Sequence, residues 1–236
     1  MKHLNTINKI YASILVLMAI ATAIKLINYK GWDRYYYGST FTSPRTYPVL
    51  VRNGQFILED GDVDYISYNA VNDHGYKQWG YGDFDDTNTK ERLPVKMVLE
   101  YASYRDESFY KDTIDLPLDA IKKAFKTVDK TGISMSLYQS PEVKRLDFVV
   151  GIANKGNIIV WLRGENFETT LLTHKITPHQ PVGDDTYYDK KRWAKKQFFK
   201  EVFYIDSAEL ADFKNGVDLH ANYIDTPSLF KVRLKK

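Results

Sequence analysis

A run of fifteen uncharged residues near the N-terminus constrains this chain more than any other feature. The run is Ile10–Ile24, and Lys9 and Lys25 stand at its two ends. An uncharged, mostly apolar segment this close to the start of a chain is typical of a transmembrane helix or an export signal. We therefore expect residues 1–30 to be a membrane anchor or a signal peptide. Residues 31–236 are then expected to form a single exported domain.

Three interpretations of this segment remain open, and an uncleaved anchor is the one we favour. Residues 10–27 span eighteen positions, within the range of about 17–25 for a transmembrane helix, if the Lys25 ammonium extends to the lipid headgroups. The small-residue triplet at 21–23 matches a signal-peptide cleavage site instead. Lys30 and Arg34 favour the anchor, because positive charge just after the segment hinders translocation. The third interpretation is a buried core helix. We expect the domain at the cell inner membrane, facing the periplasm or the exterior.

The rest of the chain is close to neutral and lacks cysteine. Residues 31–236 carry 29 Lys and Arg against 30 Asp and Glu, so we expect no nucleic-acid partner. The absence of cysteine excludes a disulfide framework, a thiolate metal site, a catalytic thiol and a lipid-modified cysteine. The 18 Tyr and 12 Phe belong to residue types that are common in β-strands and at binding surfaces.

Alternating apolar and polar residues predict an α+β domain that is mainly antiparallel β, a decorated β-sandwich with two or three short helices. The expected strands are 35–41, 47–52, 55–59, 95–102, 108–115, 146–153, 157–162, 167–177 and 229–234. The expected helices are 118–128, 188–203 and 207–214, the last capped by Ser207. Asn53-Gly54 predicts a two-residue type I′ turn between the second and third strands, because both turn positions need φ > 0. Residues 62–92 are expected to form a long irregular connection.

The sequence carries no recognised catalytic or metal-binding motif. The histidines are scattered, at positions 3, 74, 174, 179 and 220. Asp83, Asp85 and Asp86 begin like a calcium loop, but Asn88 stands where such a loop needs glycine. We therefore expect no metal, no cofactor and no enzymatic activity. The alternative is an envelope hydrolase that uses dispersed carboxylates, such as Glu100 and Glu107.

Aromatic residues in the 62–92 connection predict a surface that binds another protein. The candidate partner-binding residues are Tyr76, Trp79, Tyr81 and Phe84, because aromatic side chains most often anchor protein interfaces. The competing interpretation is that these rings cover the sheet. We expect the partner to be an unknown envelope protein, with a delivered toxin among the candidates, and membrane contact through residues 10–27.

The expected helix at 188–203 has two interpretations of its own. Its basic residues Lys190, Lys191, Arg192, Lys195 and Lys196 lie near Trp193 and Phe198. This combination occurs in helices that rest on anionic lipid. We favour the alternative, in which the aromatic face packs on the sheet and the lysines face water.

Several of these segments together resemble an uncharacterised bacterial envelope family, the domain of unknown function 2931. The resemblance covers most of residues 32–176 and lies in Trp32, Tyr36-Tyr37, Pro44, Tyr47-Pro48-Val49, Leu93-Pro94, Tyr101, Phe109-Tyr110, Leu116-Pro117, Val150-Gly151-Ile152-Ala153, Gly156, Val160-Trp161-Leu162 and Gly164. It implies an exported protein with no established activity. Members of the family are often lipoproteins, but this chain has no cysteine, so anchoring through the N-terminal helix is implied instead. By analogy, some exported domains of this kind serve as immunity proteins against toxins delivered between bacteria.

Overall fold

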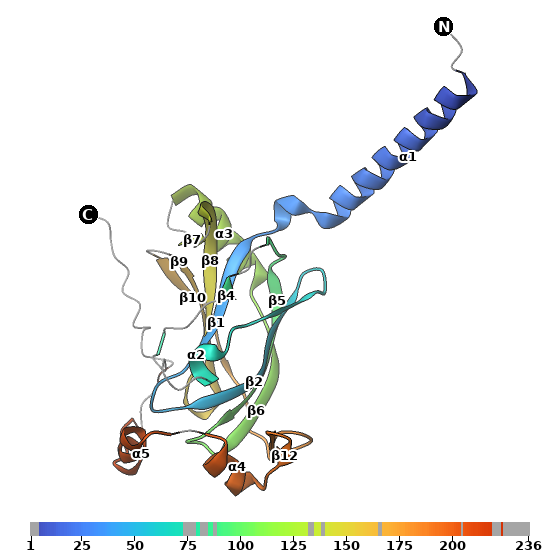
Figure 1. The fold of residues 1–236 in the computed structure, drawn as a ribbon. Coiled ribbons are helices and arrows are strands. Elements are labelled where there is room, and N and C mark those ends of the chain that lie inside the picture. The colour runs from blue at the N-terminus through green and yellow to red at the C-terminus, as the bar shows by residue number, and fades with distance from the viewer. Residues whose placement is uncertain are drawn as a thin grey trace. The chain divides into compact units, whose positions relative to one another are not determined.

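A computed structural model describes residues 5–72, 79–80, 85–86, 89–131, 135–137, 140–164, 167–203, 205–218 and 223. The chain separates into two compact units, Met1–Arg34 and Tyr35–Lys236. The first unit contains helix α1 (Thr6–Tyr29) and the 3-10 turn η1 (Gly31–Asp33) (Figure 1). None of the 24 residues of α1 is buried, and apolar side chains surround the helix. By length and composition α1 is able to cross a membrane, and a signal sequence has the same properties.

Two β-sheets form the body of the second unit (Figure 1). The larger sheet contains β1 (Tyr36–Thr42), β4 (Asp85–Asp86), β7 (Met135–Leu137), β8 (Ser140–Ile152), β9 (Asn157–Gly164) and β10 (Phe167–Lys175). Its order is β10-β9-β8-β1-β4, and β7 pairs with β8. The smaller sheet contains β2 (Val49–Leu58), β3 (Val63–Tyr65), β5 (Pro94–Ser103) and β6 (Ser108–Asp115), in the order β3-β2-β5-β6. Every pairing is antiparallel except that of β1 with β8. The expected α+β, mainly antiparallel fold is thus confirmed.

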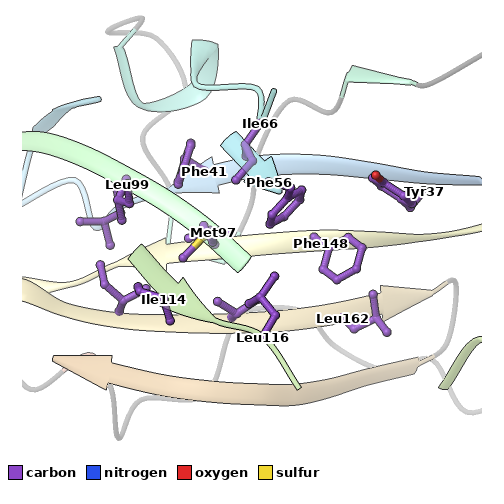
Figure 2. Packing of buried hydrophobic residues seen from close by; sticks show 14 of the residues in the cluster. Tyr37, Phe41, Phe56, Ile66, Met97, Leu99, Ile114, Leu116, Phe148 and Leu162 are labelled. Atoms are coloured by element: carbon purple, nitrogen blue, oxygen red, sulfur yellow. The ribbon is translucent and has the colours of Figure 1, made fainter. Parts of the chain in front are cut away.

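The core of this unit lies between the two sheets. Successive strand residues point to opposite faces, so each sheet presents one apolar face. The large buried side chains of both sheets meet there: Tyr37, Phe41, Phe56, Met97, Leu99, Ile114, Phe148 and Leu162 (Figure 2). Rings from the two sheets contact edge to face, since Phe56 and Phe148 lie 5.2 Å apart between centroids. Burying one such side chain contributes about 1.5–3 kcal/mol, so this layer supplies much of the driving force for folding.

The two ends of the sandwich differ. Helix α3 (Leu118–Thr131) closes the end at which the chain enters the unit, where the Phe125 ring lies 4.9 Å from the ring of Tyr35. We call this the proximal end. The distal end carries the β5–β6 turn, the hairpin β11–β12 (Tyr187–Tyr188 and Lys191–Arg192), α4 (Lys195–Glu201) and α5 (Ser207–Lys214) (Figure 1). The ten residues of β5 run between the two ends, a distance of about 33 Å at about 3.3 Å per residue.

The predicted turn at Asn53-Gly54 is wrong, because β2 passes through both residues without a break. A bulge at Arg52 shifts the pairing of β2 with β5, so that Val51 and Gly54 both face the core. Gly54 is required here for space: a Cβ atom would lie 2.2 Å from Cε2 of Phe41. The dipeptide therefore marks a bulge and a close ring contact instead of a turn.

Among the other predicted helices and strands, some are confirmed and some are wrong. The structure confirms the hairpin of β5 and β6, helix α3, the hairpin of β8 and β9, and helix α5. The helix expected at 188–203 is wrong over its first half, where β11 and β12 form a small hairpin before α4. The irregular connection at 62–92 contains β3, β4 and the short helix α2 (Asn69–Asn72). The strand expected at 229–234 lies outside the described residues.

Candidate functional site

A groove of about 720 Å³ at the distal end is the main candidate site in the part of the chain that the structure describes. Its walls come from the β5–β6 turn, from α4 and from α5. The lining residues are Tyr104, Glu107, Ala194, Lys196, Gln197, Phe199, Lys200, Phe203, Ile205 and Leu210. The groove therefore combines an apolar floor with a polar rim that contains Glu107, Lys196, Gln197 and Lys200.

The floor belongs to a compact aromatic cluster. Phe109 on β6 contacts two side chains of α4, with ring centroids 5.4 Å from Phe198 and 5.2 Å from Phe199. Phe203 stacks on Phe199 at 5.8 Å and meets Tyr104 at 5.5 Å. Neighbouring positions on α4 thus turn one face towards the sheet, as an amphipathic helix does. The favoured interpretation of this segment, an aromatic face packed on the sheet, is confirmed for residues 195–203.

The β5–β6 turn that forms one wall is held by a single carboxylate. Asp106 Oδ2 accepts hydrogen bonds from Ser103 Oγ at 3.1 Å, from the Tyr110 hydroxyl at 3.1 Å and from the Lys155 N–H at 2.9 Å. Burial, followed by the charge of Asp106, raises the pKa of Tyr110 well above its usual value, so Tyr110 stays protonated and donates. Glu107 next to it adopts φ 44, which directs the chain back into β6. These hydrogen bonds fix the conformation of the β5–β6 turn, which places Tyr104 and Glu107 in the lining of the groove.

The rim carries an excess of positive charge. Residues 187–203 hold six Lys and Arg and two Asp and Glu, whereas the rest of 31–236 holds 23 basic and 28 acidic residues. Lys196 and Lys200 line the groove itself. Lys200 lies 3.7 Å from Glu201, and Lys191 lies 3.7 Å above the ring of Trp193. The wall formed by α4 is therefore basic, whereas α5 carries Glu209 and Asp212 and the β5–β6 turn carries Asp106 and Glu107.

A second polar feature is a buried charge network on the outer face of the larger sheet. Asp147 is fully buried, and its Oδ1 lies 3.1 Å from Nε of Arg145 and accepts the Gly38 N–H at 3.1 Å. Burial raises the pKa of Asp147 to about 6, although the nearby guanidinium groups oppose this effect. Arg163 bonds Glu168 at 2.6 Å and the Gly80 carbonyl at 2.7 Å. This network joins β1, β8, β9 and β10 to the segment around Gly80, which is a structural function.

The structure places only one of the four predicted partner-binding residues, and it places that one inside. Trp79 is 5% exposed and packs on Trp161 and Tyr223, at 5.2 and 5.5 Å between ring centroids. Gly151 makes room for it, since a Cβ there would lie 2.7 Å from the Trp79 ring. Trp79 thus covers the sheet and is not available as a surface anchor. The other three, Tyr76, Tyr81 and Phe84, lie outside the described residues.

The residues considered for metal binding or hydrolysis do not converge. His174 pairs with Asp112 at 2.8 Å, and His179 lies 3.6 Å from Asp185. Within the ranges described above, no group of three His, Cys, Asp or Glu side chains is placed to hold a metal ion. Asp85 and Asp86 belong to β4, while Asp83 falls outside those ranges.

Glu100 and Glu107, the carboxylates considered for hydrolysis, occupy different parts of the β5–β6 hairpin. Glu100 lies on β5, where its Oε2 is 3.0 Å from Nζ of Lys111 on β6. Glu107 stands in the turn and lines the groove. Sequence reasoning missed this groove, although the aromatic spacing of α4 and the short helix α5 that follows it were visible signals.

Comparison with known proteins identifies a family and nothing closer. A family model described as "Protein of unknown function (DUF2931)" matches residues 27–223. No curated protein and no solved structure matches the chain. The matched region extends beyond the residues that carry the resemblance in the sequence and includes α4, α5 and the groove.

Proposed function

The chain belongs to the DUF2931 family of proteins of unknown function, and we propose that it is a membrane-tethered, non-catalytic module that binds another protein. The distal groove is the binding site, and its partner is a protein segment that carries acidic side chains around a large apolar one. The observation that carries the proposal is the rigid aromatic floor with Lys196 and Lys200 beside it. We place the domain in the cell envelope, anchored to the inner membrane by α1 and facing the periplasm or the exterior.

The floor suits an apolar anchor residue of the partner. Aromatic side chains already locked by packing lose little conformational entropy on binding, and they dominate the energy of protein interfaces. Phe199 and Phe203 are only 2% and 9% exposed, so they are fixed against each other and against the sheet and support the floor from beneath. Leu210 on α5 is 37% exposed beside them, so an apolar surface faces solvent in the groove.

The rim selects the charge of the partner. Lys196 and Lys200 stand at the edge of the groove within the basic segment 187–203, so they attract carboxylates and repel cations. An acidic segment of another protein therefore fits these charges.

The position of the groove fits a tethered receptor. The chain enters the domain at Tyr35, at the proximal end, and the groove lies at the distal end, about 33 Å away along β5. Within the domain, the groove is therefore far from the residue at which the chain enters. A toxin delivered between bacteria is one acidic partner that such a receptor would meet, and binding it would make the protein an immunity protein.

The test is a crosslinking capture from the cell envelope with the full chain. We expect Lys196→Glu combined with Lys200→Glu to reduce recovery of the partner by roughly tenfold or more, because each change turns attraction into repulsion. The matched control is Lys123→Glu combined with Lys126→Glu, the same charge change on the exposed face of α3 at the proximal end. The control should recover the partner as the wild type does.

The crosslinked peptide decides between outcomes. A peptide rich in Asp and Glu, joined to α4 or α5, supports the proposal. Equal losses in both double variants would mean general electrostatic attraction and would overturn it. Turnover of a lipid, glycan or peptide by the purified full chain, abolished by one carboxylate substitution, would overturn the non-catalytic assignment and favour an envelope hydrolase.

A further inference from the structure

The segment just after α1 has a structure suited to the boundary of a membrane. Tyr29 is the last residue of α1, and Lys30 ends the helix in the left-handed conformation, with its N–H donating to the Leu26 carbonyl at 3.1 Å. The 3-10 turn η1 follows and carries Trp32. The six residues 29–34 therefore contain two aromatic and two cationic side chains, together with Gly31 and Asp33.

Arg34 folds back onto the end of the helix. Its Nε donates to the Tyr29 carbonyl at 2.9 Å, and its guanidinium lies 4.5 Å from the centroid of the Tyr29 ring. A cation at this position satisfies a carbonyl that the helix leaves unbonded, and it interacts favourably with the helix dipole. Gly31 gives the Tyr29 ring its space, since a Cβ would lie 3.1 Å from Cε1 of that ring. The ring and the guanidinium thus form one defined unit.

Trp32 projects away from this unit. It is 73% exposed, whereas Trp79 and Trp161 are almost fully buried. An indole has an apolar body and one N–H donor, and such side chains concentrate at the level of the lipid headgroups.

The length of the helix places the segment at that level. Residues 10–29 of α1 rise about 30 Å at about 1.5 Å per residue, which equals the thickness of the hydrocarbon core. Lys9 then marks one boundary, and Tyr29 and Lys30 mark the other. Lys25 lies about one turn inside the second boundary, within reach of the headgroups.

We propose that Tyr29, Trp32 and Arg34 form an interfacial collar that binds the phospholipid headgroup region and holds α1 in the bilayer as an uncleaved span. The inference rests on the membrane tether in the proposed function and is independent of the groove. Arg34 acts as a positioning residue for Tyr29, while Trp32 and Tyr29 contact the lipid. The collar requires that the mature protein retains residues 1–30.

The test uses the full chain in vesicles of phosphatidylcholine with a minority of phosphatidylglycerol. One vesicle set carries brominated phosphatidylcholine with bromine near the headgroup, and another carries bromine near the chain ends. We expect the shallow bromine to quench Trp emission more strongly, and Trp32→Phe to remove that quenching. Trp193→Phe, which removes a partly exposed Trp of the distal end, is the matched control and should leave the quenching in place.

Two further measurements separate the collar from the tether. The mass of the protein isolated from cell membranes should correspond to the full 27.4 kDa chain. A shorter protein, cleaved near residues 21–23, would overturn both the collar and the tether. A full-length protein whose quenching is absent, or is stronger with deep bromine, would overturn the collar alone. Arg34→Gln should weaken the shallow quenching, because the helix end next to Trp32 loses the hydrogen bond at the Tyr29 carbonyl.

Discussion

At the scale of single residues, Gly54 shows how one missing side chain fixes the sheet packing. We expect Gly54→Ala to lower the free energy of unfolding by about 1–3 kcal/mol, because the new methyl group would overlap the Phe41 ring. A urea titration measures the loss. Phe41→Leu in the same chain should recover part of it, because the smaller side chain yields space. Strictly additive effects of the two substitutions would contradict the close contact between Gly54 and Phe41.

Asp147 is the residue whose protonation should alter stability. Burial raises its pKa in the folded protein to about 6, above the ordinary value of 3.8, so the folded state binds this proton more tightly than the unfolded state. Its contribution to stability is therefore complete below about pH 4 and is lost as the pH rises through about 6. A change in pKa from 3.8 to about 6 corresponds to about 3 kcal/mol in the free energy of unfolding.

The comparison of wild type with Asp147→Asn isolates this group. Wild type should gain stability relative to the variant as the pH falls from 7 to 4, and urea titrations at each pH measure the difference. Asp62→Asn serves as a control at an exposed carboxylate. If the difference between wild type and Asp147→Asn stays constant across this range, the raised pKa is refuted.

At the scale of elements, helix α5 forms one wall of the groove, and its N-cap lies one residue before the predicted cap, Ser207. The Asp206 carboxylate accepts the Glu209 N–H at 2.7 Å, so Asp206 is the N-cap and Ser207 is the first helical residue. We expect Asp206→Ala to cost about 1 kcal/mol of stability and Ser207→Ala to cost much less. Thermal unfolding of the two variants distinguishes them. Equal losses would restore Ser207 as a capping residue.

The sequence was most informative where an element is decided by its own residues. The hairpin of β5 and β6 and the helix α3 follow from alternation and from helical spacing, since each buries one continuous face. The prediction of a turn at Asn53-Gly54 is wrong because the same dipeptide also suits a bulge in β2. Glycine is needed there to leave space for the Phe41 ring of another strand. The prediction of a helix over residues 188–194 is wrong because charged residues are as common on a helix surface as on an exposed hairpin such as β11–β12.

At the scale of the whole molecule, the candidate site depends on contacts that no local pattern records. The groove joins a turn near residue 105 to helices near residues 198 and 210, and the aromatic cluster beneath them adds Phe109. The aromatic residues of the 62–92 connection carried the sequence-based prediction of a binding surface. Trp79 instead packs on Trp161 across the outer face of the larger sheet. Composition showed many aromatic side chains, and only the fold shows which of them face solvent.

The final prediction concerns the side of the membrane on which the domain lies. The flanking charges are even, because Lys2, Lys9 and the amino terminus precede the apolar run and Lys25, Lys30 and Arg34 follow it. The expectation of an exported domain therefore rests on the resemblance of residues 1–30 to an export signal. We therefore expect alkaline phosphatase fused after Lys236 to be active, because this reporter folds only outside the cytoplasm. The same fusion without residues 1–30 should be inactive. Activity confined to a cytoplasmic reporter at the same position would reverse the topology, and the distal groove would then be presented to cytoplasmic proteins.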